Sequence, residues 1–307
     1  MSSIAVCVSV DWEGRSLLAE NLRTIADFRS KHADVPMQHF LNAAYYTREG
    51  SNAARTTEAI QQAVLPGDEH GLHVHAWGSL LSAASVGIRS SPTFFDADTQ
   101  VPRAADDWGF YPAEVGYEVP LEHFAVSELQ SIVRTSLDIL TSQGFRRPVS
   151  FRAGGWISGL KVQEAIVRSG LLYDCSAVDP QLTVRRFGDC PLGRLLRGLW
   201  HDIGDTSQPY RMRTSQGPLW QIPNNAGLVD YTTVDELLEV FRRNVVYSQN
   251  SRRPVQILST GFHQETARRF LSRLDEAIDL MRRLAAENGL SLIFTARPWE
   301  WLDALGV

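Results

Sequence analysis

The sequence predicts an α/β protein whose strands curl into a distorted (β/α) barrel of about seven to eight strands. Short runs of apolar and β-branched residues recur along the 307-residue chain, as expected of strands. Longer stretches with helical periodicity separate them, as expected of crossover helices. No Pro/Gly-rich linker and no repeat of fixed period divides the chain, so residues 1–307 are predicted to form a single domain.

Eight segments have the length and composition of buried strands. In chain order they are Ile4–Val10, Met37–Ala43, His70–Ala76, Pro148–Gly154, Leu171–Ala177, Leu219–Asn225, Val255–His263 and Ser291–Arg297. Eight strands alternating with helices are typical of a barrel.

The helices between these strands carry their own start and stop residues. In "SELQSIVRTSLDILTSQG", Ser127 is the predicted N-cap and Gly144 follows the helix as its C′ residue. Thr233 and Glu236 form a capping box ahead of "LLEVFRRNVV". Residues 264–287 have helical periodicity and end at "NG".

One long segment lacks a clear period. Residues from about 78 to 122, after the third strand, are rich in Ser, Pro, Asp and aromatic residues. We expect a long insertion that covers one rim of the barrel, where α/β folds keep their active sites.

Composition and charge exclude several classes of partner. With 44% hydrophobic and 21% charged residues the chain is an ordinary globular protein. A net charge of −5 gives no general attraction to nucleic acid or to anionic lipid. Neither a secretory leader nor a run of about 18 apolar residues is present, so the prediction is a cytoplasmic protein without a membrane span. Cys7, Cys175 and Cys190 are too widely spaced for a zinc knuckle and are expected to be reduced and buried.

Two pairs of polar residues stand at the ends of predicted strands. Asp11 and Glu13 follow the first strand, and His73 and His75 belong to the third. Residues two apart in an extended chain point to the same side. A D-x-E pair and an H-x-H pair at one end of a barrel would offer carboxylates and imidazoles to a divalent cation.

Three further strand ends carry Arg152, Asp174 and His263. Each has a structural interpretation as well: Arg152 could pair with Asp174, and His263 could cap the helix that begins near residue 264. Asp11 could likewise cap the helix after the first strand. Polar groups at five strand ends favour a common site over scattered surface polarity.

The ordered set resembles the NodB-homology polysaccharide deacetylases, carbohydrate esterase family 4. The resemblance lies in "SVDWEG", "EHGLHVHAW", "SFRAGGW", "YDCSA" and "LSTGFHQE", which together cover most of the chain in the family's order. It implies a NodB-like barrel that holds a divalent metal, most often zinc, with cobalt, nickel or iron as the other candidates. The activity it implies is removal of an N-acetyl group from a sugar.

The resemblance also implies roles for individual residues. Asp11 would be the general base, with Arg152 orienting it, and His263 the general acid. Asp174 would support that base and acid network. The metal ligands would be Glu13, which stands where the family has an aspartate, His73 and His75.

The chain departs from the family pattern at the second metal histidine. The family places it four residues after the first, where this chain has Trp77, so His75 takes that role. Asp11 on the metal with Glu13 as base is the alternative assignment. Three tryptophans near strand ends either stack against a sugar ring or pack in the core: Trp12, Trp77 and Trp156.

Three functions remain open from the sequence. The first is a metal-dependent N-deacetylase acting on an acetylated sugar or glycan precursor. The second is a metal-dependent C–N hydrolase acting on a non-sugar amide such as a cyclic ureide, because a fold does not fix a substrate. The third is a catalytically silent descendant that binds carbohydrate or a partner protein.

Overall fold

The computed structural model describes residues 3–95, 114–186, 189–251 and 253–305. Part of the predicted insertion, residues 96–113, lies outside this range. Within the described residues the strands form one sheet. They are β1 (Ser3–Asp11), β2 (Met37–Asn42), β3 (Glu69–Val74), β4 (Ser150–Ala153), β5 (Tyr173–Asp174), β6 (Tyr210–Thr214), β7 (Gly217–Gln221), β8 (Val255–His263) and β9 (Ser291–Phe294). Every predicted strand is present, and β6 is additional.

The sheet order is β6-β7-β5-β4-β3-β2-β1-β8, and β9 pairs with the first half of β1. All pairs are parallel except β6 with β7. Residues 224–229 run along the other side of β8: Ala226 N donates to Ser259 O and Val229 N to Gly261 O. A bridge from Val178 to Asn224 connects the same segment to the chain after β5. The predicted α/β fold with a distorted barrel is therefore confirmed.

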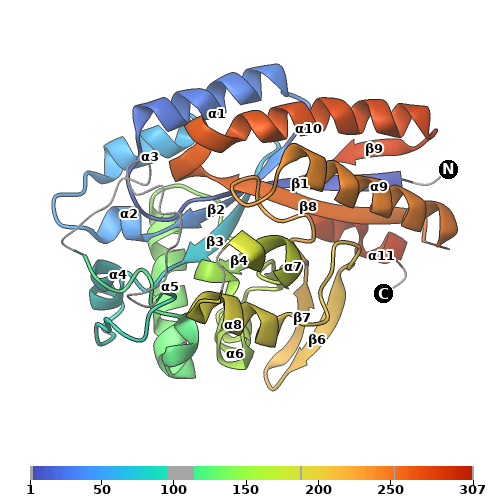
Figure 1. Ribbon diagram of the computed structural model, residues 1–307. Coiled ribbons are helices and arrows are strands. Elements are labelled where there is room, and N and C mark those ends of the chain that lie inside the picture. Colours follow the sequence, from blue (N-terminus) through green and yellow to red (C-terminus); the bar gives the residue numbers. More distant parts are fainter. Residues whose placement is uncertain (1–2, 96–113, 187–188, 252, 306–307) are drawn as a thin grey trace.

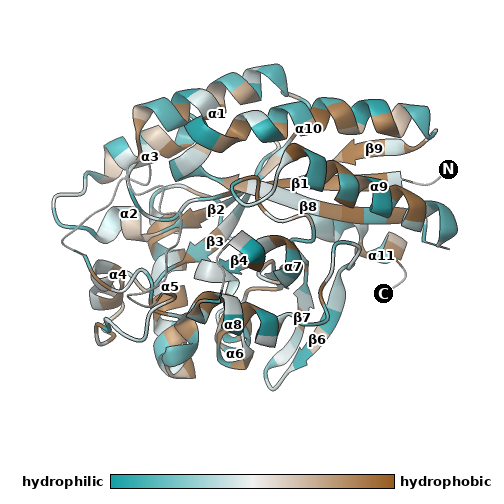
Figure 2. Cartoon of the chain, viewed as in Figure 1, coloured by the Kyte–Doolittle hydropathy of each residue, from teal (hydrophilic) through white to brown (hydrophobic). Residues whose placement is uncertain are grey.

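Helices cover the outside of the sheet. The longer ones are α1 (Ala19–Lys31), α3 (Ala53–Gln61), α5 (Val126–Ser142), α6 (Leu160–Arg168), α8 (Pro191–Leu199), α9 (Val234–Asn250) and α10 (Ala267–Glu287). Short ones are α2 (Ala44–Thr47), α4 (Gly78–Ala83), α7 (Pro180–Thr183) and α11 (Leu302–Leu305), with 3₁₀ turns η1 (Leu121–His123), η2 (Gly154–Trp156), η3 (Val184–Arg186), η4 (Gln264–Thr266) and η5 (Pro298–Trp301). In Figure 1, α1 and α10 lie side by side along β1 and β8, and α5 packs against α6. Figure 2 shows teal and brown alternating along α9 and α10, as expected of helices with one buried face. No helix in the described ranges is both long enough and apolar enough to cross a membrane.

The predicted helix ends were right in part. Thr233 and Glu236 form the expected capping box at α9, with Glu236 N donating to Thr233 Oγ1 at 3.3 Å. Gly144 follows α5 with φ +86°, a conformation that favours glycine. The prediction of Ser127 as N-cap was wrong. The helix begins at Val126, because the Glu128 carboxylate accepts a hydrogen bond from the Ala125 backbone N–H at 2.7 Å.

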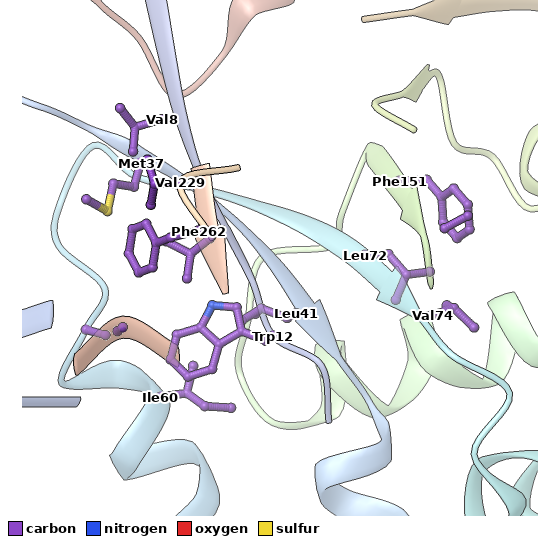
Figure 3. Packing of buried hydrophobic residues seen from close by; sticks show 14 of the residues in the cluster. Val8, Trp12, Met37, Leu41, Ile60, Leu72, Val74, Phe151, Val229 and Phe262 are labelled. Carbon is purple, nitrogen blue, oxygen red and sulfur yellow. The ribbon is translucent and has the colours of Figure 1, made fainter. Parts of the chain in front are cut away.

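The largest apolar cluster lies between the sheet and the outer helices. Figure 3 shows Trp12 in this cluster, near Leu41, Ile60 and Phe262. Trp12 is 0% exposed, and its indole Nε1 donates to His39 Nδ1 at 3.2 Å. Of the two interpretations of Trp12, substrate contact and core packing, its burial supports core packing, because the alternation of side chains that continues from β1 turns it toward the helices. The three cysteines are free and buried, as expected.

Candidate functional site

The carboxyl ends of the parallel strands bring the predicted polar residues together. Asp11 is paired in register with His263 on β8, and His73 with Arg152 on β4. Glu13 lies two residues beyond the end of β1. All five side chains are 6% exposed or less. The site is therefore a buried cluster of charged and imidazole groups at one end of the barrel.

Glu13 lies between the two histidines of the H-x-H pair. His73 Nε2 is 3.1 Å from Glu13 Oε1, and His75 Nε2 is 2.8 Å from Glu13 Oε2. Ligand atoms of Glu13, His73 and His75 all lie within 4.8 Å of one another. Those of Asp11, Glu13 and His263 form a second such group.

The other nitrogen of each imidazole contacts a backbone carbonyl. His73 Nδ1 is 2.9 Å from Arg152 O, and His75 Nδ1 is 2.8 Å from Tyr117 O. A carbonyl only accepts hydrogen bonds, so each Nδ1 carries the proton and a neutral ring has its lone pair on Nε2. When both rings are neutral, their two Nε2 lone pairs face the Glu13 carboxylate, and a cation between these groups would stabilise the arrangement. A backbone carbonyl on the distal nitrogen is also the usual support of a metal-binding histidine. The residues fit a divalent cation.

Electrostatics within the cluster favour an ionised Glu13. Burial opposes its charge, but His75 and His73 outweigh burial and hold the pKa of Glu13 well below its usual range. Burial lowers the pKa of His75, and the Glu13 charge offsets this only in part. The result is an anionic carboxylate beside at least one neutral imidazole, which is the protonation that cation binding requires.

Asp11 is held by Arg152 rather than by the histidine pair. Arg152 Nη1 donates to Asp11 Oδ1 at 2.6 Å and to Ser9 Oγ at 2.7 Å, and Nε donates to Cys175 O at 3.0 Å. The Arg152 backbone carbonyl positions His73, while its side chain positions Asp11. The structural interpretation in which Arg152 pairs with Asp174 was wrong.

Asp174 belongs to a separate network. Its carboxylate accepts hydrogen bonds from the side chains of Ser158, Ser176 and Gln221, and it contacts neither Asp11 nor His263 within the described structure. Burial raises the pKa of Asp174. The expectation that Asp174 supports the base and acid network was wrong, because Asp174 is paired in register with Phe151, one residue before Arg152, and its hydroxyl and amide neighbours already satisfy the carboxylate.

Asp230, which the sequence interpretation did not single out, lies beside His263. Asp230 Oδ1 lies 3.1 Å from His263 Nδ1, and Oδ2 accepts from the His263 backbone N–H at 3.2 Å. Burial alone would lower the pKa of His263, but Asp230, with help from Glu13 and Asp11, raises it to about 10. His263 Nε2 is 3.4 Å from Glu13 Oε1, so the imidazolium faces the centre of the site. Among the described residues, its side chain makes no capping hydrogen bond to η4.

A second carboxylate missed by the sequence interpretation holds the backbone after β1. Glu265, on η4, accepts from the backbone N–H groups of Glu13 and Arg15, both at 3.3 Å, and from the Tyr45 hydroxyl at 2.5 Å. Burial and the nearby Glu13 charge raise the pKa of Glu265 to about 7. These bonds fix the turn that presents Glu13.

The other two tryptophans lie beside the site. Trp77 Nε1 donates to Glu13 O at 2.9 Å and its side chain is buried, so it holds the Glu13 backbone. Trp156 has φ +57° and packs in a second buried apolar cluster that includes Phe94 and Trp200, and its ring centroid is 6.4 Å from that of His263. Tyr231 flanks the same imidazole at 5.7 Å. The Trp156 indole N–H is buried without an acceptor among the described residues, so Trp156 remains a candidate substrate contact.

Neither the search of protein-family models nor the search of curated proteins found a match. Solved structures do match. A protein from Mycobacterium smegmatis described as a polysaccharide deacetylase aligns with 100% of this chain and 92% of its own, at 14% identity and a TM-score of 0.57. A protein from Pseudomonas aeruginosa PAO1 with the same description aligns with 98% of this chain and 92% of its own, at 14% identity and a TM-score of 0.53. Puue allantoinase aligns with 98% of this chain and 91% of its own, at 16% identity and a TM-score of 0.54. The chain has the NodB-like fold of the polysaccharide deacetylases.

Proposed function

We propose that this protein is a metal-dependent hydrolase that removes an N-acetyl group from a sugar or glycan precursor. The observation that carries the proposal is the placement of one carboxylate within 3.1 Å of the Nε2 atoms of two imidazoles, with a second carboxylate and a third imidazole beside them. Glu13, His73 and His75 would hold the cation, and zinc suits this set of nitrogen and oxygen ligands best. Cobalt, nickel and iron are the other candidates.

When bound, the cation would polarise the amide carbonyl and lower the pKa of the attacking water. Asp11 is suited to take the proton of that water. Its Oδ1 accepts a hydrogen bond from Arg152, which orients the carboxylate, and its Oδ2 receives no hydrogen bond from the described residues. The pairing of Asp11 with Arg152 and of Glu13 with the histidines favours Asp11 as base and Glu13 as ligand over the reverse assignment.

His263 is suited to protonate the departing amine. A general acid must carry its proton at the working pH, and Asp230 keeps this imidazole protonated. The base and the acid reach the site from adjacent strands, at paired positions on β1 and β8. A scissile amide placed between them would have the attacking water on one side and the leaving nitrogen on the other.

A second substrate class is favoured by a specific finding. Puue allantoinase matches this chain as well as the deacetylases do. A metal-dependent hydrolase acting on a cyclic ureide or a similar non-sugar amide would use the same base, acid and cation. Assays of acetate release from N-acetylated sugars beside ring opening of cyclic ureides separate the two substrate classes.

The test of the base assignment is Asp11→Asn. Hydrolysis should be lost while bound metal remains close to the wild-type amount, because the substitution removes the proton acceptor and no ligand. Loss of metal together with activity would instead assign Asp11 as a ligand. His263→Ala should lower turnover and keep the metal.

A further inference from the structure

Tyr117 contacts both ends of the proposed ligand set. Its hydroxyl donates to Glu13 Oε2, and its backbone carbonyl accepts from His75 Nδ1 at 2.8 Å. Its ring stacks on the His75 imidazole, with centroids 4.0 Å apart and planes 12° apart. One residue therefore fixes the tautomer and the plane of one ligand and the orientation of another.

The backbone around Tyr117 is fastened to the end of β3. Gly78 N donates to Val115 O at 2.8 Å, and Ser79 N donates to Glu114 Oε1 at 2.7 Å. Gly116 has φ +99°, and a Cβ at this position would lie 2.0 Å from Ala76 O. Only glycine allows so close an approach. The position of Tyr117 is thus set by the same chain segment that carries His75.

The other face of the Tyr117 ring is also covered. The Arg15 guanidinium lies 3.9 Å from the ring centroid, and the Trp77 ring packs against the Tyr117 ring at a tilt, with centroids 4.8 Å apart. The three groups form a stack of His75, Tyr117 and Arg15. A ring held on both faces and bonded at its hydroxyl has little rotational freedom, which is what a group that orients ligands requires.

We infer that Tyr117 is a positioning residue of the metal centre, so that the segment 114–119 is part of this centre rather than a cover over it. The inference rests on the proposed metal site. Its reason lies in the ligands themselves. Glutamate has one more rotatable bond than aspartate, and the Tyr117 hydroxyl restrains it. His75 lies just beyond the end of β3, where the sheet no longer orients its ring, and the Tyr117 carbonyl and ring do so.

The experiment measures zinc affinity of the full-length protein by competition with a chromophoric chelator. Tyr117→Phe removes only the hydroxyl and should weaken zinc binding by about 10-fold, the lower end of the effect of losing a group that supports a ligand. Tyr117→Ala, which also removes the stack, should weaken it by up to about 100-fold. Tyr46→Phe is the matched control, because its hydroxyl contacts Thr57 far from the ligands, and its zinc affinity should equal that of the wild type.

Thermal unfolding of the metal-free proteins separates positioning from a general structural role. Without metal, the melting temperature of Tyr117→Phe should lie within a few degrees of that of the wild type. Zinc should raise the melting temperature of the variant less, because a ligand with a larger dissociation constant stabilises the folded protein less. Wild-type affinity in Tyr117→Phe would overturn the inference and leave the proposed function intact. A wild-type protein that binds no zinc would overturn the proposed function and with it the inference.

Discussion

The environment of Gly154 gives a direct test of the position of His75. A Cβ built on Gly154 would lie 2.6 Å from Nδ1 and Cε1 of the His75 ring and 2.7 Å from Cγ. The backbone of Gly154 is not in the left-handed region, so alanine is compatible with the main chain. In Gly154→Ala the ring would have to move by about 0.8 Å to restore ordinary van der Waals contact.

A displacement of that size should weaken metal binding by about 10- to 100-fold and lower the free energy of unfolding by about 1–3 kcal/mol. Isothermal titration with zinc and denaturant unfolding measure the two effects. Gly198→Ala is the matched control: Gly198 lies in α8 with nothing within 4 Å of an added Cβ, so stability should be equal or slightly higher and zinc affinity unchanged. Unaltered zinc affinity in Gly154→Ala would refute the assignment of His75 as a ligand.

Two further predictions concern carboxylates. Asp230→Asn removes the charge that most raises the pKa of His263; the pKa falls, and the basic limb of kcat/KM should move to lower pH by about one unit or more with metal retained. An unmoved limb would exclude His263 as the acid. The pKa of Asp174 is raised by burial, so the folded protein binds this proton more tightly than the unfolded chain, and stability is lost as pH rises through the folded pKa. Asp174→Asn should therefore gain stability relative to the wild type as the pH rises above about 4, the usual pKa of an aspartate, in urea unfolding, and a pH-independent difference would contradict this reasoning.

The fold was largely predictable because its strands are short apolar runs with helices between them. The strand β6 was the exception. Its residues alternate between intermediate and exposed positions, and Arg211 and Arg213 face solvent at the edge of the sheet. An edge strand that pairs only with β7 does not need an apolar run, so nothing in its composition marks it as a strand.

The site residues that lie at the ends of strands could be predicted from the sequence. Asp11, Glu13, His73 and His75 follow from the two-residue period at the ends of β1 and β3. The same period puts Trp12 on the opposite side of the chain from Asp11 and Glu13, toward the core.

The missed residues lie on segments without a period. Asp230 follows an isolated bridge, Tyr117 lies in the irregular segment after α4, and Glu265 is on a 3₁₀ turn. Their contacts with His263, His75 and Glu13 join residues 33 to 252 positions apart. Such contacts depend on how the loops pack over the barrel, which hydrophobic periodicity does not encode.

The most direct test of the central claim is elemental analysis of the purified protein, prepared with metal supplied and chelator excluded. His73→Ala and His75→Ala are compared with the wild type, and His70→Ala is the control, since this histidine of β3 packs against Phe145 instead of facing Glu13. The account predicts near-stoichiometric zinc, cobalt, nickel or iron in the wild type and in His70→Ala, and a large loss in the other two variants. A wild-type protein without metal, or His73 and His75 variants that keep it, would contradict the account.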